Sequence, residues 1–253
     1  MALNFQSGNP ALSEKFFSKS LSVDSTETMT EKGTLNKMSI LMVLLIAAAA
    51  ITWQYAATIP SIFGWMIGAA IIGFIIAIVL AFKPQWSPYG APIYAIMEGV
   101  FLGGISVYFN NAFAETAPGI IMQAVVITFG TVIGMFLLYR FGIIKATEKF
   151  KAVVFTATAG IALFYFIAIV LRYAFHISIP FIHESTTFGI IFSLIVVAIA
   201  ALNLILDFDQ IDQGVAMGAP KYMEWYGAFG LMVTIVWLYI EVLRLLVKMS
   251  GRR

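Results

Sequence analysis

Four acidic side chains lie within long apolar stretches of the sequence, where a charge is costly. Glu98 lies in the middle of one stretch, Asp207 and Asp209 close another, and Glu241 lies well inside the last one. An ionisable group in hydrocarbon costs about 2.5–3.5 kcal/mol or more, so it normally faces a bundle interior, a partner or water. We therefore take these acids as the candidate functional site.

Carboxylates at several depths of a membrane suit two related chemistries. Carboxylate oxygens bind hard cations such as Ca²⁺. Carboxyl groups that are buried or lie beside other acids also bind protons closer to neutral pH than they do in water. If the helices are adjacent, the acids form a ladder in the order Asp209, Asp207, Glu98 and Glu241. The ladder predicts either cation passage that depends on pH or a proton relay, and the pattern alone does not decide between them.

Each acid also has a purely structural explanation. Glu98 could be a protonated acid bonded to a neighbouring helix, and Asp209 could be solvated at a helix end. Arg244 lies one helical turn after Glu241, so the two could neutralise each other as a charge pair. Asp207 is harder to explain in this way, because small and polar residues share its helix face at helical spacing: Asn203, Ala200 and Ser193.

The stretch that contains Glu98 also has a packing signature. Small residues recur there every four positions, at Ala91, Ala95, Gly99 and Gly103. Such a face allows two helices to approach closely. Packing explains the glycines but not the acid beside them. A closely packed helix with one acid at mid-depth suits a narrow polar path.

The elements that position these residues follow from composition. Of the 253 residues, 61% are apolar and only 11% are charged, against roughly 25% charged in an ordinary globular protein. This excludes a soluble enzyme, a nucleic-acid-binding protein and a disordered chain. The apolar residues form blocks of about 20, the length that crosses a ~30 Å hydrocarbon layer as a helix. We expect seven such segments, at about 38–59, 61–82, 89–109, 119–140, 152–174, 187–209 and 225–248.

The expected organisation has three parts. Residues 1–37 form a polar, flexible cytosolic tail, residues 38–248 a seven-helix transmembrane domain, and residues 249–253 a short basic tail. The loop lysines and arginines favour an N-terminus in the cytoplasm, because basic residues concentrate on that side. The basic C-terminus does not fit this orientation if the number of spans is odd, unless the last segment re-enters.

Several chemistries have no residues to support them. The chain has no cysteine, which excludes disulfides, thiolate metal sites and thiol nucleophiles. We expect its two histidines, His176 and His183, in a solvated loop. No catalytic or nucleotide-binding motif occurs, and Asp207 lies too near its helix end for an intramembrane protease built on paired aspartates. We therefore expect no enzyme activity, no cofactor and no nucleic-acid partner.

Three sequence motifs resemble the transmembrane Bax inhibitor motif family, and its bacterial branch most of all. They are APIYAIMEGVFLGGIS, LNLILDFDQID and WLYIEVLRLL, and the likeness covers roughly residues 38–248. The resemblance implies a seven-helix bundle with a central last helix and a pH-sensitive Ca²⁺ leak. It also implies that two acids on the sixth and seventh helices form a proton-sensing pair. By motif position these are Asp207 and Glu241, which are then also the Ca²⁺ ligands if the ion binds.

The sequence departs from this family in two respects. The second acid is Glu241 rather than an aspartate. Residues 61–82 contain no lysine or arginine, whereas the family's leak channels have a basic latch residue on the second helix, so Arg244 is a candidate substitute. On straight helices, Asp207 and Glu241 would also differ in depth by about 20 Å.

The first functional hypothesis is a pH-sensitive leak channel for a cation, with Ca²⁺ as the expected ion, in the bacterial cytoplasmic membrane. A second is an interaction protein that modulates another membrane protein, such as a membrane protease, through its tail. A third is a proton-coupled carrier of a small solute, with candidate polar groups Gln123, Thr131, Thr156 and Tyr165.

Overall fold

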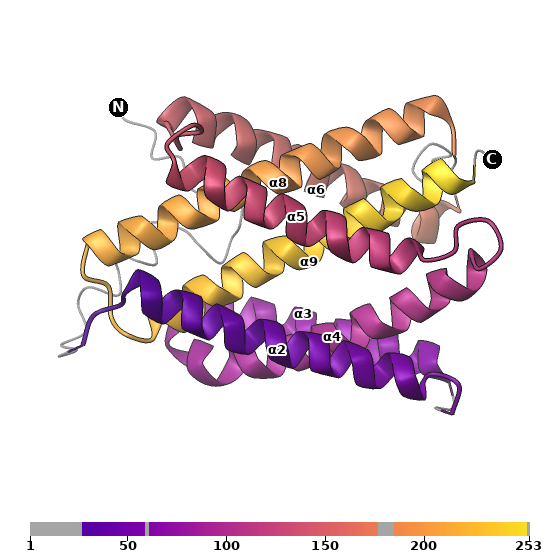
Figure 1. Ribbon diagram of the computed structural model, residues 1–253, viewed down its shortest axis with the longest axis horizontal. Coiled ribbons are helices and arrows are strands. Elements are labelled where there is room, and N and C mark those ends of the chain that lie inside the picture. The colour runs from indigo at the N-terminus through magenta and orange to yellow at the C-terminus, as the bar shows by residue number, and fades with distance from the viewer. Residues whose placement is uncertain (1–26, 59–60, 177–184, 252–253) are drawn as a thin grey trace. The chain divides into compact units, whose positions relative to one another are not determined.

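The computed structural model describes residues 27–58, 61–176 and 185–251. Seven helices in this part of the chain are long and apolar enough to cross a membrane (Figure 1). They are α2 (Glu31–Tyr55), α3 (Ile62–Phe82), α4 (Ser87–Ala112), α5 (Ile120–Arg140), α6 (Glu148–Phe175), α8 (Thr187–Ala216) and α9 (Met223–Ser250), with a 3₁₀ turn, η1 (Pro84–Trp86), before α4. The predicted all-α polytopic membrane protein is thereby confirmed.

The described residues form two compact units. One unit contains residues 113–206 and 237–251, and the other contains residues 27–112 and 207–236, with the gaps given above. The helices α8 and α9 each contribute to both units. The predicted acids are therefore divided: Glu98, Asp207 and Asp209 belong to the unit that contains α2, and Glu241 belongs to the unit that contains α6.

Close packing of α4 organises the unit that contains α2, α3 and α4 (Figure 1). The stripe of small residues makes this possible. Ala91 and Ala95 are fully buried. A Cβ atom at Gly99 would collide with the backbone carbonyl of Leu45 in α2, and one at Gly103 would lie 2.7 Å from that of Ala49. A side chain at either glycine would push the two helices apart.

The other unit joins α6 to parts of α8 and α9. The rings of Phe164 in α6 and Phe192 in α8 meet edge to face, with centroids 5.3 Å apart. Nearby, the side-chain amide of Asn203 donates to the hydroxyl of Thr158 at 2.8 Å. In hydrocarbon, such hydrogen bonds contribute to helix association because water is not there to compete.

The structure corrects the predicted end of the sixth segment. The helix α8 continues to Ala216 instead of ending at Asp209, and the following connection is short and closes at Gly218, whose φ is +69°. The apolar pattern stops near residue 206, but the helix does not, because Gln213 donates to Asp209 one turn earlier and Ile211 is buried. The argument that Asp207 lies too near a helix end therefore loses its basis.

The N-terminal helix also begins earlier than its apolar pattern. The helix α2 starts at Glu31, so residues 31–37 of the predicted tail are helical, and the hydroxyl of Thr30 caps it by accepting from the Gly33 amide. Residues 1–26, His183 and residues 252–253 lie outside the described residues. His176 ends α6 with a φ of 55°.

The last helix, α9, has a larger buried fraction than the other described helices. In α9, 61% of the most apolar stretch is buried, the largest share among the seven helices described, whereas the figure is 17% for α3 and α5. The expected central position of the last helix stays a prediction. The exposed side chains of α3 and α5 are large and apolar, among them Trp65, Phe74 and Phe136, as contact with lipid requires.

Candidate functional site

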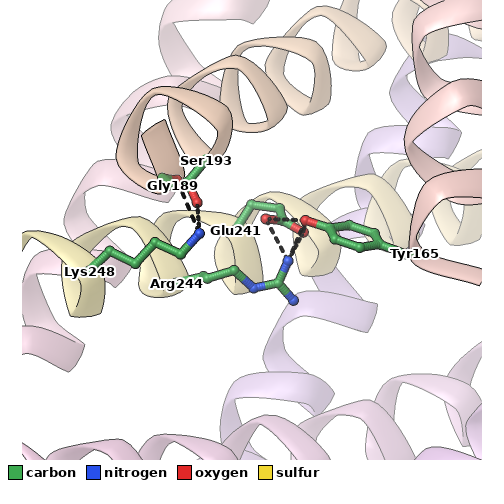
Figure 2. Close-up of polar contacts among 6 residues, drawn as sticks. All are labelled: Tyr165, Gly189, Ser193, Glu241, Arg244 and Lys248. Atoms are coloured by element: carbon green, nitrogen blue, oxygen red, sulfur yellow. Dashed lines mark hydrogen bonds and ion pairs between the residues drawn. The ribbon is translucent and has the colours of Figure 1, made fainter. Parts of the chain in front are cut away.

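The carboxylate of Glu241 forms a closed polar cluster with two other side chains (Figure 2). Arg244, one turn later on α9, donates from Nη1 to both carboxylate oxygens at 3.0 and 3.1 Å. Tyr165 on α6 donates its hydroxyl to the same oxygens at 3.2 and 3.3 Å. Arg244 also donates to the Tyr165 hydroxyl, and its guanidinium lies 4.9 Å from the centre of the tyrosine ring. Each of the three side chains therefore contacts the other two.

The electrostatics of this cluster are asymmetric. The side chain of Glu241 is 2% exposed, whereas that of Arg244 is 32% exposed. A buried carboxylate without a counter-charge is strongly unfavourable, so Arg244 compensates Glu241 at this position. Because the Arg244 side chain is partly exposed, its guanidinium can leave the carboxylate more easily than the carboxylate can leave the interior. A cation that reached Glu241 would compete with Arg244 for the same oxygens.

A second basic residue of α9, Lys248, forms hydrogen bonds with α8 (Figure 2). The ammonium of Lys248 donates to the backbone carbonyl of Gly189 at 3.1 Å and to the hydroxyl of Ser193 at 2.8 Å. Lys248 is buried, with an exposed fraction of 2%. Ser193, which belongs to the predicted polar face of α8, is therefore a partner of this lysine.

Asp207 is completely buried on α8, with an exposed fraction of 0%. It lies four residues after Asn203, which donates both to Thr158 and to the Ile199 carbonyl at 2.8 Å. Asp209 accepts a hydrogen bond from Gln213. Asn203 and Asp207 are buried, whereas Asp209 and Gln213 are partly exposed. The predicted direct pairing of Asp207 with Glu241 stays a prediction, since the two acids belong to different units.

Glu98 lies between α4 and α3. It is hydrogen bonded to the hydroxyl of Tyr94, one turn earlier, and a Cβ atom at Gly73 of α3 would lie 3.1 Å from its carboxylate. Tyr94 packs edge to face on Phe229 of α9, with ring centroids 4.9 Å apart. A glycine opposite Glu98 leaves room for its carboxylate within an otherwise apolar contact.

A buried acid with several polar partners, Glu224, was not predicted as a site residue. The Glu224 carboxylate forms ion pairs with Lys37 at 3.2 Å and Lys221 at 3.1 Å, and it accepts from the backbone amide and hydroxyl of Thr30. Glu224 lies directly before the expected apolar segment 225–248, so the apolar pattern did not mark it. The i,i+3 spacing of Lys221 and Glu224 was the only local signal, because the other partners lie far away in the sequence.

Two of the four polar groups considered for a solute carrier, Tyr165 and Thr131, have other partners. Tyr165 is bonded to Glu241 and Arg244, and the hydroxyl of Thr131 donates to the backbone carbonyl of Ile127 in its own helix. Among the described residues, no cluster of three or more His, Cys, Asp or Glu side chains is placed to hold a metal ion.

The comparison with protein families gives one match. A family model described as Bax inhibitor 1 like matches residues 9–251. The match spans all seven helices and agrees with the resemblance drawn from the three motifs. Neither the curated proteins nor the solved structures gave a match.

Proposed function

Because the chain belongs to the Bax inhibitor 1 like family, we propose that this integral membrane protein is a cation leak channel whose conductance depends on pH. Ca²⁺ is the permeant ion in this proposal, and the membrane is the bacterial cytoplasmic membrane, with the N-terminus in the cytoplasm. The activity is transport without catalysis. Family membership and seven apolar helices support a role within the bilayer; the acids support the choice of ion.

One observation carries the proposal: two carboxylates are almost completely buried within membrane-spanning helices. Asp207 has an exposed fraction of 0% and Glu241 of 1%. Carboxylates in such positions are energetically unfavourable, and neither is needed to form an apolar helix. Oxygen donors of this type match the ligand preference of Ca²⁺.

The proposed gating uses the protonation of these acids. When they are deprotonated, they attract the cation and repel one another; when protonated, they form hydrogen bonds and close the path. Arg244 adds a second control at Glu241, since its guanidinium occupies both carboxylate oxygens. Ion passage at this point requires Arg244 to release them. Glu98 provides an intermediate carboxylate on α4.

The test is Ca²⁺ flux into proteoliposomes at acidic and alkaline pH. Wild type is compared with Asp207→Asn and Glu241→Gln, and Glu115→Gln serves as a control because this acid is exposed in the α4–α5 connection. We expect greater flux at alkaline pH, and loss of this difference in the first two variants only. Equal wild-type flux at both pH values contradicts the gating. Absence of flux above empty liposomes, with well-folded protein, contradicts the leak and favours an interaction protein that acts through its N-terminal tail.

A further inference from the structure

The segment before α2 runs along the connection between α8 and α9. Thr28 and Pro220 form an antiparallel bridge. On either side of it, the Met29 amide donates to the Ala219 carbonyl at 2.7 Å and the Lys221 amide donates to the Glu27 carbonyl at 3.1 Å. Met29 and Ala219 are buried. Two regions that lie far apart in the sequence are therefore joined by backbone hydrogen bonds and an apolar anchor.

Glu224 reinforces this junction from the first turn of α9. Its Oε1 accepts from the amide and the hydroxyl of Thr30 at 3.0 and 2.9 Å and pairs with Lys221 at 3.1 Å, while Oε2 pairs with Lys37. The Glu224 side chain is 0% exposed. Hydrogen bonds to a charged group are stronger than those between neutral groups, and a buried carboxylate that lost them would be left uncompensated.

Two further features couple the starts of α2 and α9. Thr30 caps α2 through its hydroxyl oxygen and donates through the same hydroxyl to Glu224. Gly33, in the first turn of α2, leaves the space that the Glu224 carboxylate fills, since a Cβ atom there would overlap it. The two helices cannot separate at this end without breaking contacts of both Thr30 and Glu224.

We propose that residues 27–30 are a strap that, through Glu224, holds the connection between α8 and α9 and limits the cation leak. The second part of this statement rests on the proposed function. The connection joins the two helices that bear Asp207 and Glu241. Movement of these helices relative to α2 moves the connection, and the strap opposes that movement.

The strap can be tested without measuring flux, because the chain has no cysteine. Ala219 is buried, so the rate at which a water-soluble maleimide labels the variant Ala219→Cys reports opening. Glu224→Gln removes the charge, and Gly33→Ala displaces the carboxylate without changing any charge. Gly68→Ala on α3 is the matched control, since a Cβ atom there meets nothing within 4 Å. We expect labelling at least roughly tenfold faster in the first two variants, given the strength of charged hydrogen bonds, and an unchanged rate in the control.

A disulfide provides the opposite perturbation. The Thr28–Pro220 bridge is a non-hydrogen-bonded antiparallel pair, for which the Cα atoms are about 4.5 Å apart, within the range that a disulfide spans. We expect Thr28→Cys with Pro220→Cys to crosslink on oxidation, to lower Ca²⁺ flux severalfold, and to regain it on reduction. Each single cysteine variant controls for the substitutions. Glu224→Gln and Gly33→Ala should raise flux, and Gly68→Ala should not.

The outcomes separate the two proposals. If wild type carries no flux, the proposed function fails, and labelling still decides whether the strap exists. If labelling is equally slow in Glu224→Gln, Gly33→Ala and wild type, the strap is wrong even when flux is normal. If labelling accelerates in both variants while flux stays at the wild-type level and the disulfide does not reduce it, the strap does not limit the leak and that part of the proposal is overturned.

Discussion

The hydroxyl of Tyr165 on α6 lies 3.2 and 3.3 Å from the two carboxylate oxygens of Glu241 on α9. This contact joins a ring that packs among apolar side chains to an acid with an exposed fraction of only 1%. It makes Tyr165 the residue that fixes the orientation of Glu241 from a neighbouring helix, while Arg244 acts from the same helix.

Removal of the Tyr165 hydroxyl should destabilise this unit. Tyr165→Phe keeps the ring and deletes one donor to a buried carboxylate, so we expect a loss of about 1 kcal/mol. Thermal unfolding in detergent measures the change. Tyr173→Phe is the control on the same helix, because Tyr173 is 77% exposed. Equal stability of the two variants would contradict a structural role for the contact.

The ion pair between Glu241 and Arg244 should show measurable coupling. In a double-mutant cycle with Glu241→Gln and Arg244→Gln, we expect the double variant to be more stable than the sum of the single changes predicts, by roughly 0.5–3 kcal/mol. The reason is that each single change leaves a partner uncompensated.

A second ion pair with the same i,i+3 spacing gives the comparison. Glu148 and Lys151 on α6 lie 3.4 Å apart, but the Glu148 side chain is 67% exposed. Exposed pairs contribute about 0–1 kcal/mol, so the coupling measured there should be the smaller of the two. Coupling of equal size in both cycles would show that the burial of Glu241 has no energetic consequence.

Alanine at Gly99 should weaken the packing of α4 on α2. The added methyl group would collide with the Leu45 carbonyl and Ala48, and overpacking of this kind costs about 1–3 kcal/mol. Gly130→Ala on α5 is the control, since nothing lies within 4 Å of its Cβ position. That variant should gain stability, because alanine favours a helix over glycine by about 0.8–1.0 kcal/mol. A melting temperature for Gly99→Ala at or above that of wild type contradicts the close packing.

Glu98→Gln should reduce Ca²⁺ flux without a large change in stability. The amide oxygen can still accept from Tyr94, but the side chain can no longer carry a negative charge. Flux in proteoliposomes and thermal unfolding are measured on the same preparation, with Glu115→Gln as the exposed control. Wild-type flux in Glu98→Gln would exclude Glu98 from the ion path and leave it a packing residue.

The sequence was sufficient to predict features that depend on neighbours along one helix. The seven apolar segments follow from length and composition, the small face of α4 from spacing, and the contact of Arg244 with Glu241 from the helical repeat. Each of these features depends on residues within one helical turn or one membrane-spanning segment. In a membrane, such local patterns determine much of the architecture because the backbone must form helices.

Features that depend on distant partners were not predictable in this way. The end of α8 was placed too early because hydropathy reports the apolar part of a helix rather than its hydrogen-bonded length. Glu224 was missed because Thr30 and Lys37 lie far from it in the sequence. The acceptors of Lys248, Gly189 and Ser193, are more than fifty residues earlier in the sequence.

The two charges at the ends of α9 have one more consequence. Aligned peptide units give a helix a partial positive charge at its N-terminus and a partial negative charge at its C-terminus. Glu224 lies in the first turn of α9 and Lys248 in the last. Each side chain therefore carries a charge opposite in sign to that of the helix end beside it, which is favourable. In surroundings of low polarity, where water screens little, this matching favours one direction of the helix. If the two charges were exchanged, the positive one would lie at the positive end of the helix and the negative one at the negative end, and both positions would be unfavourable.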